Sequence, residues 1–322
     1  MISLPSHHSP LSSEVQGILA PHGIGYRIKL LSQLSGRKFQ ERLDPFGLTP
    51  FHWVVLCCLW QEDGLATSVL GDRLQQVGGT LTGVLDRMAE RNLIRRTRDA
   101  HDRRVWRIWL TDEGRKLQDT LPPIAIELRE VALQGISYAD RDRLSQLLDR
   151  MLINRQRFTL PISEKSLGSI ELDVTESRRG WQEILAPYSL GYRIKLLAQL
   201  LTRTFQENLE PIGLTPFHWI VLCCLWQEDG LATSNISDQL QQVGGTLTGV
   251  LDRMAERNLI RRERDAHDRR VWRIWLTDAG QELSQVLPPI ALKVMQETMQ
   301  GISASEQEQF SQWINESSEN LT

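Results

Sequence analysis

The sequence predicts a mainly α-helical protein that carries one small β-hairpin in each of two tandem domains. Shifting the 322-residue chain against itself by 166 positions aligns Gly25 to Ser137 with Gly191 to Ser303 without a gap, so the chain is a duplication. Within each copy, apolar residues recur mainly at helical spacings, and strand-like alternation is limited to one short hairpin. The length also suffices for two separate cores.

The repeat divides the chain into four regions. The stretch between the copies is mostly polar and has no clear helical or strand period. We therefore expect a flexible N-terminus at residues 1–13, a first domain at 14–157, a linker at 158–179 and a second domain at 180–322.

The two copies are most alike in one central segment. Between Leu74 and Asp112, the only difference is that Thr97 of the first copy is replaced by Glu263 in the second. The C-terminal third of each copy has diverged considerably. Whatever function segment 74–112 has, we expect both copies to share it.

Each copy is predicted to begin with an amphipathic helix, which spans residues 24–44 in the first copy. Its apolar residues recur at spacings of three and four, and Pro45 follows its end. Thr49 then provides an N-cap, and Pro50 occupies the first position of a second helix. Because residues 51–60 are apolar nearly all round, this second helix is predicted to be buried.

A helix-turn-helix is predicted next. Thr67 or Ser68 begins a short helix that runs through Leu74, and the pair Gly78–Gly79 breaks it. Thr80 is predicted to cap the following helix, which carries apolar residues at helical spacing.

A two-stranded hairpin is predicted after this pair of helices. Its strand-like segments are residues 93–96 and 105–110, joined by the polar segment 99–104. A helix-turn-helix followed by such a hairpin, or wing, is a winged helix-turn-helix. The predicted fold class is therefore mainly α with small β-wings, as two winged helix-turn-helix domains.

The remainder of each copy is predicted to be helical. Thr111 opens a long helix that we expect to kink near Pro122–Pro123. Ser137 and Asp140 then form a capping box for the last helix, and the second copy repeats this box.

Charge is distributed unevenly along the chain. The formal net charge of -3 argues against a protein that coats polyanions. However, 16 of the 31 arginines lie in two short windows, residues 87–107 and 253–273. These windows predict one local basic surface in each copy.

Several other classes of protein are disfavoured. No basic stretch precedes an apolar run at the N-terminus, and no segment approaches the roughly 18 apolar residues of a membrane span. The adjacent pairs Cys57–Cys58 and Cys223–Cys224 lie in apolar runs, which favours a reducing cytoplasm over a disulfide framework. We expect a cytoplasmic, nucleoid-associated protein without a membrane partner. Because the sequence has no phosphate-binding loop, nucleophile elbow or paired carboxylates, we expect neither catalysis nor a cofactor.

Four stretches of the first copy together indicate a family. They are Leu48 to Trp53, Gly78 to Met88, Arg91 to Ile94, and the wing from Asp99 to Thr111. In this order and spacing, present twice, they resemble the MarR family of bacterial winged-helix regulators and cover most of each copy. The sequence departs from the residues common in the family at Val77 and the two glycines after it, in the turn, and at Gly83.

The resemblance implies a sequence-specific regulator of transcription that binds double-stranded DNA, more often a repressor. It also implies an obligate two-fold dimer whose first and last helices interlock. Here the linker would supply both subunits in one chain, so we expect a single-chain pseudo-dimer. Because the reading surfaces are nearly identical, we expect a near-palindromic operator with half-sites roughly 10 bp apart or a multiple of that.

Two groups of residues are candidates for DNA contacts. In such a domain the second helix of the helix-turn-helix lies in the major groove, which makes Gln76, Thr80 and Thr82 candidates to face the bases. Arg103 and Arg104 lie at the wing tip, where an arginine enters a narrow minor groove. The second copy repeats these candidates as Gln242, Thr246, Thr248, Arg269 and Arg270.

Further charged residues support these contacts. Asp102 and its counterpart Asp268 are candidates to orient a wing arginine. Arg87 and its counterpart Arg253 are candidates for DNA contacts. In this group either phosphate neutralisation or internal pairing with Asp86 and Glu90 is expected. Its members are Arg87, Arg95, Arg96 and Arg98.

Two alternatives stay open for this surface. The arginines can form a solvated, salt-bridged face, because acidic residues are interspersed among them. The protein can also be a scaffold that kept the fold and binds protein partners. Intact arginine pairs in both wings favour DNA over the scaffold.

Members of the family often release DNA when a small aromatic or phenolic ligand binds or when a cysteine is oxidised. The ten tryptophans either line such a pocket or form the core, and the ligand-binding residues stay unassigned. The cysteine pairs either pack in the core or sense redox state. His52 and His218 lack a second ligand at metal-binding spacing, so no metal site is expected.

Overall fold

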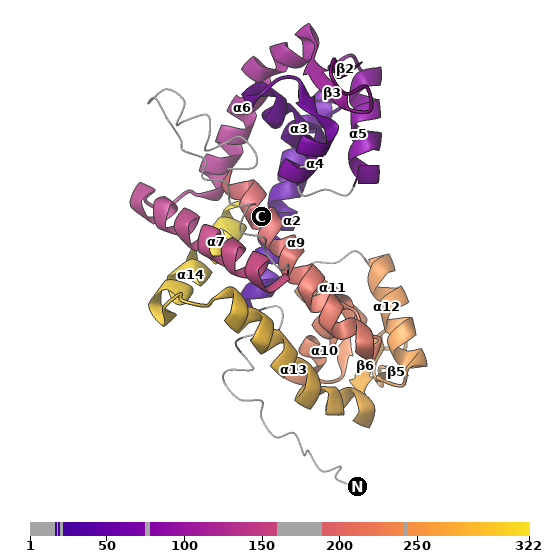
Figure 1. Ribbon diagram of the computed structural model, residues 1–322. Coiled ribbons are helices and arrows are strands. Elements are labelled where there is room, and N and C mark those ends of the chain that lie inside the picture. The colour runs from indigo at the N-terminus through magenta and orange to yellow at the C-terminus, as the bar shows by residue number, and fades with distance from the viewer. Residues whose placement is uncertain (1–16, 18, 20–21, 75–77, 160–188, 241–243) are drawn as a thin grey trace, which may run out of the picture. The chain divides into compact units, whose positions relative to one another are not determined.

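The computed structural model of the chain describes residues 17, 19, 22–74, 78–159, 189–240 and 244–322 (Figure 1). The predicted N-terminal segment 1–13 and residues 160–179 of the predicted linker lie outside this part of the chain.

Each copy contains the same series of helices and strands. The first copy has α2 (Ile24–Leu43), η1 (Asp44–Phe46), α3 (Pro50–Gln61), β1 (Leu65–Ala66), α4 (Thr67–Leu74), α5 (Gly78–Glu90), β2 (Ile94–Arg98), β3 (Trp106–Leu110), α6 (Asp112–Ala132) and α7 (Tyr138–Thr159). The second copy has α9 (Leu190–Leu209), η3 (Glu210–Ile212), α10 (Pro216–Gln227), β4 (Leu231–Ala232), α11 (Thr233–Leu240), α12 (Gly244–Glu256), β5 (Ile260–Arg264), β6 (Trp272–Leu276), α13 (Asp278–Thr298) and α14 (Ala304–Asn320). The predicted fold class, two winged helix-turn-helix domains, is confirmed.

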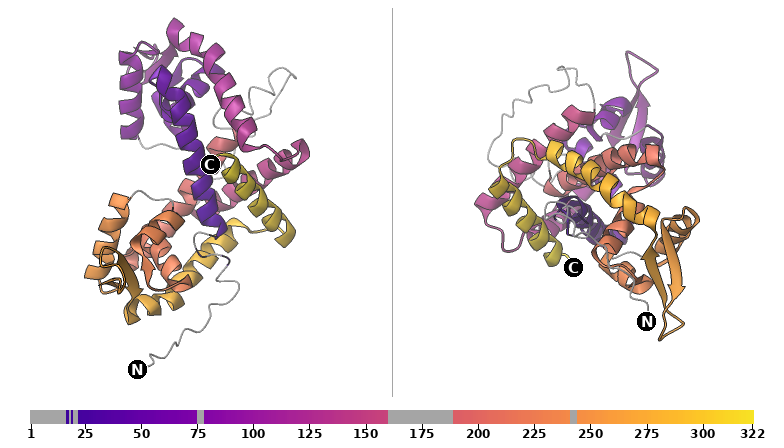
Figure 2. Two further views of the ribbon diagram at one scale, coloured as in Figure 1. Left: turned by 180° about the vertical axis from the view of Figure 1, so that it is seen from behind. Right: turned by 90° about the horizontal axis from the view of Figure 1, so that it is seen from below.

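The wing is a three-stranded antiparallel sheet in each copy, with the order β1-β3-β2 in the first and β4-β6-β5 in the second. The prediction of two strands was therefore wrong. The missing strand has two residues, and Leu65 pairs with Ile108 of β3. The predicted hairpin has the register Ile94 opposite Leu110 and Arg98 opposite Trp106. Figure 2 shows the hairpins extending beyond the helices of their own domains.

The buried helix α3 begins as predicted. The Thr49 hydroxyl accepts a hydrogen bond from the amide of His52, and Nδ1 of His52 accepts one from the amide of Thr49. This reciprocal pair is a capping box with histidine in the place that glutamate usually takes. The residues from His52 to Leu59 are all buried, which gives each large apolar side chain about 1.5–3 kcal/mol of transfer free energy.

Helices α5 and α7 differ from their predictions, and the kink expected in α6 stays a prediction. Helix α5 begins at Gly78 and includes the glycine pair, so Thr80 is its third residue instead of its cap. Glycine is tolerated at the start of a helix, where it is among the favoured N-cap residues. Helix α6 runs on through Pro122–Pro123 to Ala132, and α7 runs to Thr159, past the predicted start of the linker at residue 158.

The chain forms two compact units, and each unit combines segments of both copies. The first-head unit contains residues 30–152, 189–197 and 308–322. The second-head unit contains the described residues before 30, together with 153–159, 198–240 and 244–307. Each winged head thus packs against the start of the other copy's first helix and the end of the other copy's last helix.

Polar contacts connect the two copies within the first-head unit. The Tyr192 hydroxyl donates to the carbonyl oxygen of Leu74 at 3.1 Å, and Arg193 pairs with Asp149 at 2.7 Å. The side-chain amide of Asn320 donates to the carbonyl oxygens of Ala132 and Gln134.

The second-head unit has equivalent contacts. The Tyr26 hydroxyl donates to the carbonyl oxygen of Leu240 at 3.0 Å. The Asn154 amide donates to the carbonyl oxygens of Thr298 and Gln300. Arg155, whose counterpart in the other copy is Leu321, is fully buried in this unit. It pairs with Glu297 at 3.2 Å and donates to the Thr204 hydroxyl at 2.8 Å. A buried arginine requires such partners, because an unpaired buried charge is strongly destabilising.

Each head has its own apolar core. In the first head, Trp53 of α3 makes edge-to-face contacts with Phe39 and with Trp60. In the second head, Trp219 makes the same contacts with Phe205 and Trp226. These tryptophans therefore belong to the cores.

Over the described residues, no single helix has the length and hydropathy of a membrane span. The bent pair Leu190–Ile212 and Pro216–Gln227 reaches the length and hydropathy of a span only when its two segments are taken together, on length and composition alone.

Candidate functional site

The second helix of the helix-turn-helix, α5, has one buried and one exposed face. Its apolar residues, Leu81, Val84, Leu85 and Met88, are buried in the head. Thr82 and Arg87 are exposed on the opposite face, as are Thr248 and Arg253 of α12. This amphipathic pattern leaves one side of the helix available for a ligand.

The remaining candidates on this helix are only partly described. Gln76 and Gln242 lie outside the described residues. Thr80 and Thr246 belong to the described helices, but their side chains lie outside the description.

Gly83 lies beside Arg87 on the exposed face of α5. A Cβ atom at Gly83 would lie 3.9 Å from Nη1 of Arg87, and Gly249 stands in the same relation to Arg253. This distance is an ordinary van der Waals contact, so a small side chain at Gly83 would also fit beside the guanidinium group.

The loop at the wing tip is organised by Asp99. Its carboxylate accepts hydrogen bonds from the amides of His101 at 2.8 Å and Asp102 at 3.0 Å, and from Nε of Arg107. Arg107 also donates to the carbonyl oxygen of Gly64 at 3.0 Å. The hydrogen bond from Arg107 holds the pKa of Asp99 well below its usual range. Asp265 and Arg273 repeat this arrangement in the second wing.

Sequence reasoning did not identify Asp99 as the residue that organises the loop. The available signal was its spacing, because aspartate often accepts hydrogen bonds from backbone amides two or three residues further along a turn.

The wing-tip arginines are exposed. Arg103, Arg104 and their counterparts in the second copy belong to the loop that Asp99 or Asp265 organises. Asp102 accepts a hydrogen bond from the backbone amide of Arg104 at 2.9 Å, so its observed bond orients the backbone at that residue.

Most of the neighbouring arginines have intramolecular partners. Arg91 donates to the carbonyl oxygens of Gly47 and Phe46, and Arg96 pairs with Asp86 at 2.8 Å. Arg95 and Arg98 stack on Trp109 and Trp106, with 5.5 and 3.9 Å from each guanidinium carbon to the ring centroid. In contrast, Arg87, Arg103 and Arg104 have no ion-pair partner within the described ranges.

The single difference between the copies in segment 74–112 changes the wing. In the first copy, Nε1 of Trp109 donates to the Thr97 hydroxyl at 2.9 Å. In the second copy, Glu263 pairs with Arg261, and the buried Nε1 of Trp275 has no hydrogen-bond partner among the residues that the structure describes.

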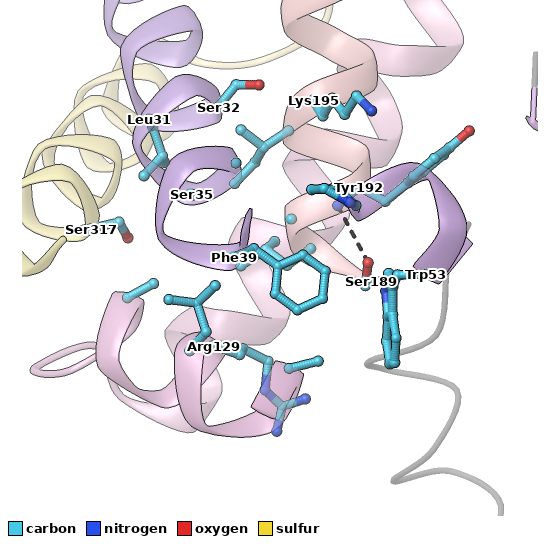
Figure 3. A pocket seen from close by; sticks show the side chains of 18 of the residues that line it. Leu31, Ser32, Ser35, Phe39, Trp53, Arg129, Ser189, Tyr192, Lys195 and Ser317 are labelled. Atoms are coloured by element: carbon cyan, nitrogen blue, oxygen red, sulfur yellow. Dashed lines mark hydrogen bonds between the residues drawn. The ribbon is translucent and has the colours of Figure 1, made fainter. Parts of the chain in front are cut away.

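A cavity of about 160 Å³ lies in the first-head unit, next to the head. Its lining includes Phe39 of α2, Trp53 of α3, Arg129 of α6, and Tyr192 and Lys195 of α9 (Figure 3). The second-head unit has a smaller cavity of about 100 Å³ at the equivalent place. Each cavity is mainly apolar with a few polar side chains, which is typical of sites for small molecules.

Tyr192 connects the first cavity to the head. Its ring lines the cavity, and its hydroxyl bonds the carbonyl oxygen of Leu74, the last residue of α4. Burial raises the pKa of Tyr192 to about 12, so the hydroxyl stays a donor. A displacement of the Tyr192 ring would therefore change the hydrogen bond to Leu74, at the end of α4 that precedes α5.

The four cysteines are buried and form no disulfide with one another. Burial raises the pKa of Cys58 to about 11 and that of Cys224 to about 12. Protonated, buried thiols react slowly with oxidants, which favours packing over redox sensing. Burial also lowers the pKa of His52, whose Nδ1 is occupied by the helix cap. The described part of the chain contains no group of three or more potential metal ligands.

The comparisons with known proteins agree on one family. A model of the MarR family matches residues 48–106 and 214–272. The HTH-type transcriptional regulator TtmR of Methylorubrum extorquens is 41% identical over 147 residues, which cover 45% of this chain and 69% of the relative. The transcriptional regulator HosA of Escherichia coli O127:H6 is 31% identical over 123 residues, which cover 38% of this chain and 90% of the relative.

Solved structures include a similar chain. A crystal structure of a MarR transcriptional regulator from Methanosarcina mazei Go1 is 27% identical, with a TM-score of 0.40. The match covers 42% of this chain and 97% of that one.

Proposed function

Because the chain belongs to the MarR family, we propose that it is a sequence-specific transcription regulator, a repressor, that binds double-stranded DNA through its two winged heads. The observation that carries this proposal is the set of exposed arginines on α5 and the wing tip. Arg87, Arg103 and Arg104 lack ion-pair partners within the described residues, and the second head repeats them.

Each part of the surface has a distinct contact in this proposal. Thr82, Thr80 and Gln76 face base edges in the major groove, and Arg87 contacts a phosphate. Arg103 and Arg104 enter the adjacent minor groove, held there by the loop that Asp99 and Asp102 fix. The second head makes the same contacts with a second half-site, so the operator is near-palindromic.

We propose further that one chain acts as a pseudo-dimer. Each head needs helical segments from the other copy to complete its unit, which supports this arrangement. Tethering both heads in one polypeptide raises the effective concentration of the second head to about the millimolar range. Binding then depends little on protein abundance.

Regulation by a small aromatic molecule is part of the proposal. The cavity in the first-head unit has room for a ring, and Tyr192 links its wall to the end of α4. A ligand that displaces Tyr192 would loosen the attachment of the helix-turn-helix, and the affinity for DNA would fall.

Selection of bound sequences from random duplexes at near-physiological salt tests the DNA-binding proposal. We expect an enriched near-palindrome. The double variant Arg103→Ala with Arg269→Ala should weaken binding to it by about tenfold or more and reduce the salt slope by about two, one for each lost arginine contact.

A control of equal charge is Arg143→Ala with Arg203→Ala. These two side chains are 72% and 74% exposed on α7 and α9, away from the wings. The control should bind within about twofold of the wild type. No enriched half-site, or equal weakening by both double variants, argues for the protein-binding scaffold instead.

A further inference from the structure

Each unit contains an interface between the two copies, and the two interfaces share one register. In the second-head unit, Asn154 near the end of α7 donates to the carbonyl oxygen of Thr298 at 3.0 Å. In the first-head unit, Asn320 at the end of α14 donates to the carbonyl oxygen of Ala132 at 3.2 Å. The two donors are 166 residues apart, and so are the two acceptors. Positions that are equivalent in sequence are therefore equivalent at the two interfaces.

The residue after each asparagine differs between the interfaces. Arg155 is fully buried in the second-head unit, and its counterpart Leu321 is 2% exposed in the first-head unit. Arg155 pairs with Glu297 of α13 at 3.2 Å and donates to the buried Thr204 hydroxyl of α9 at 2.8 Å. One interface thus contains a buried polar cluster at the position where the other has an apolar side chain.

The residues that accept from Arg155 are also specific to one copy. The first copy has Val131 in the place of Glu297 and Lys38 in the place of Thr204. It therefore offers neither the carboxylate nor the hydroxyl, and it adds a cation. The end of the first copy suits the second copy, and the apolar end of the second copy suits the first.

A pair of like copies would lose this match. In a pair of two first copies, each Arg155 would be buried opposite Val131 and Lys38. In a pair of two second copies, Leu321 would face Glu297, whose carboxylate would lose its guanidinium partner. Removing one partner of a buried ion pair is strongly destabilising, because the other charge stays buried without compensation. The larger cost falls on Arg155, since the side chain of Glu297 is 24% exposed.

From this asymmetry we infer that Arg155, with Glu297 and Thr204, decides which copies pair: a first copy pairs with a second copy and not with another first copy. The inference rests on the proposed pseudo-dimer and names the residues that make its halves unlike. Buried polar groups fix register and partner choice in other helical assemblies, at some cost in stability. Because two like copies always belong to two chains, this preference also keeps chains from joining through like pairs.

The asparagines provide an internal comparison. Asn154 and Asn320 donate to backbone carbonyl oxygens, which every combination of copies offers. Their hydrogen bonds therefore strengthen like and unlike pairs equally. Only the arginine cluster distinguishes between the two kinds of pair at these positions.

Exchange of fragments in the cut full chain tests the inference. The chain is folded intact, cut at a protease site inserted between residues 160 and 188, and mixed with the same cut chain labelled with nitrogen-15. After the labels have mixed fully, native mass spectrometry counts the pairs of each composition. We expect like pairs to form about a tenth of all pairs or fewer, against about half for random pairing, since a penalty of roughly a hundredfold or more acts on them.

A triple variant removes the preference without leaving a buried charge unpaired. Arg155→Leu with Glu297→Val and Thr204→Lys gives both interfaces the same residues at the three positions. The fraction of like pairs should rise to roughly a third or more, because no pairing then breaks a buried ion pair. Separation of partners by composition also shows directly that the fragments of this variant still pair.

Moving the cluster to the other interface should restore the preference. Adding Leu321→Arg, Val131→Glu and Lys38→Thr to the triple variant places the arginine in the first-head unit, opposite a carboxylate and a hydroxyl. Like pairs should return to about a tenth or fewer, for the reason that applies to the wild type. A fraction that stays as high as in the triple variant would contradict the role of the cluster.

Two controls separate partner choice from general weakening. Asn154→Ala with Asn320→Ala should weaken every pairing and leave the proportion of like pairs unchanged. Arg143→Ala, at a side chain 72% exposed on α7, should change neither property. Random pairing of the wild-type fragments, or a triple variant as selective as the wild type, would overturn the inference and leave the pseudo-dimer intact. Wild-type fragments that stay single would contradict the pseudo-dimer itself.

Discussion

Asp99 fixes the first wing by accepting hydrogen bonds from the amides of His101 and Asp102 and from the guanidinium group of Arg107. Sequence reasoning assigned an orienting role to Asp102, because an aspartate beside two arginines suggests a charge pair. The observed bonds of Asp102 go to the backbone of its own loop. The strand register decides which of several nearby acidic residues an arginine pairs with. The sequence alone does not specify the distances between these side chains.

The pKa of Asp99 predicts how acid affects the protein. Arg107 lowers the pKa in the folded state, so folding favours the carboxylate. The resulting stabilisation is present above the ordinary value of 3.8 and is lost as the pH falls below it. The wild-type melting temperature should therefore fall more steeply between about pH 5 and 3 than that of Asp99→Asn with Asp265→Asn, which cannot titrate.

Scanning calorimetry over this pH range measures the difference. Asp142→Asn, at an exposed position of α7, is the control and should follow the wild-type profile. Parallel profiles for the wild type and the Asp99 and Asp265 double variant would contradict the role given to these carboxylates.

Long periodic elements were predictable, and short ones were not. The helices α2 and α3 follow from apolar spacing and from the Thr49 cap. Strand β1 has two residues, too few to carry a period, and it exists because β3 offers it a free edge. The glycines at the start of α5 suggested a break, yet glycine is tolerated at the start of a helix.

Gly64 lies in the turn between α3 and β1, directly before β1, and tests how this strand is held. Its φ of +78° is in the left-handed region, and an added Cβ would lie 2.5 Å from the Trp109 ring. Gly64→Ala should therefore lower the free energy of unfolding by roughly 1–3 kcal/mol, measured by urea denaturation. Gly36→Ala, inside α2 with nothing within 4 Å of the new Cβ, should raise it by about 0.5–1 kcal/mol. Equal effects of the two variants would contradict this description of the wing.

At the scale of the whole molecule, segments of both copies complete each compact unit. The duplication and the two winged heads could be predicted from the sequence, because the repeat is direct. The exchange of helical segments, in which each head packs against helices of the other copy, could not be derived from the residues. The reason is that the first helices of the two copies have nearly the same apolar pattern. Resemblance to a dimeric family suggested it, and contacts such as Tyr192 to Leu74 and Tyr26 to Leu240 now specify it within each unit.

The exchange predicts what happens when the chain is cut between the copies. A protease site inserted between residues 160 and 188 should, after cleavage, give two fragments that elute together in size-exclusion chromatography. Each fragment holds the other through the contacts of Arg193, Asn154 and Asn320. As a control, Asn154→Ala with Asn320→Ala should weaken the association of the cut fragments. Separate elution of the unvaried fragments would mean that the copies fold independently.

The most direct test of the central claim is the mass of the complex on DNA. Sedimentation velocity with a labelled duplex that carries the selected near-palindrome gives the number of chains bound at each site. We predict one chain per duplex, with both half-sites protected from hydroxyl-radical cleavage. Two chains per duplex, each protecting one half-site, would contradict the proposal that one polypeptide supplies both reading heads.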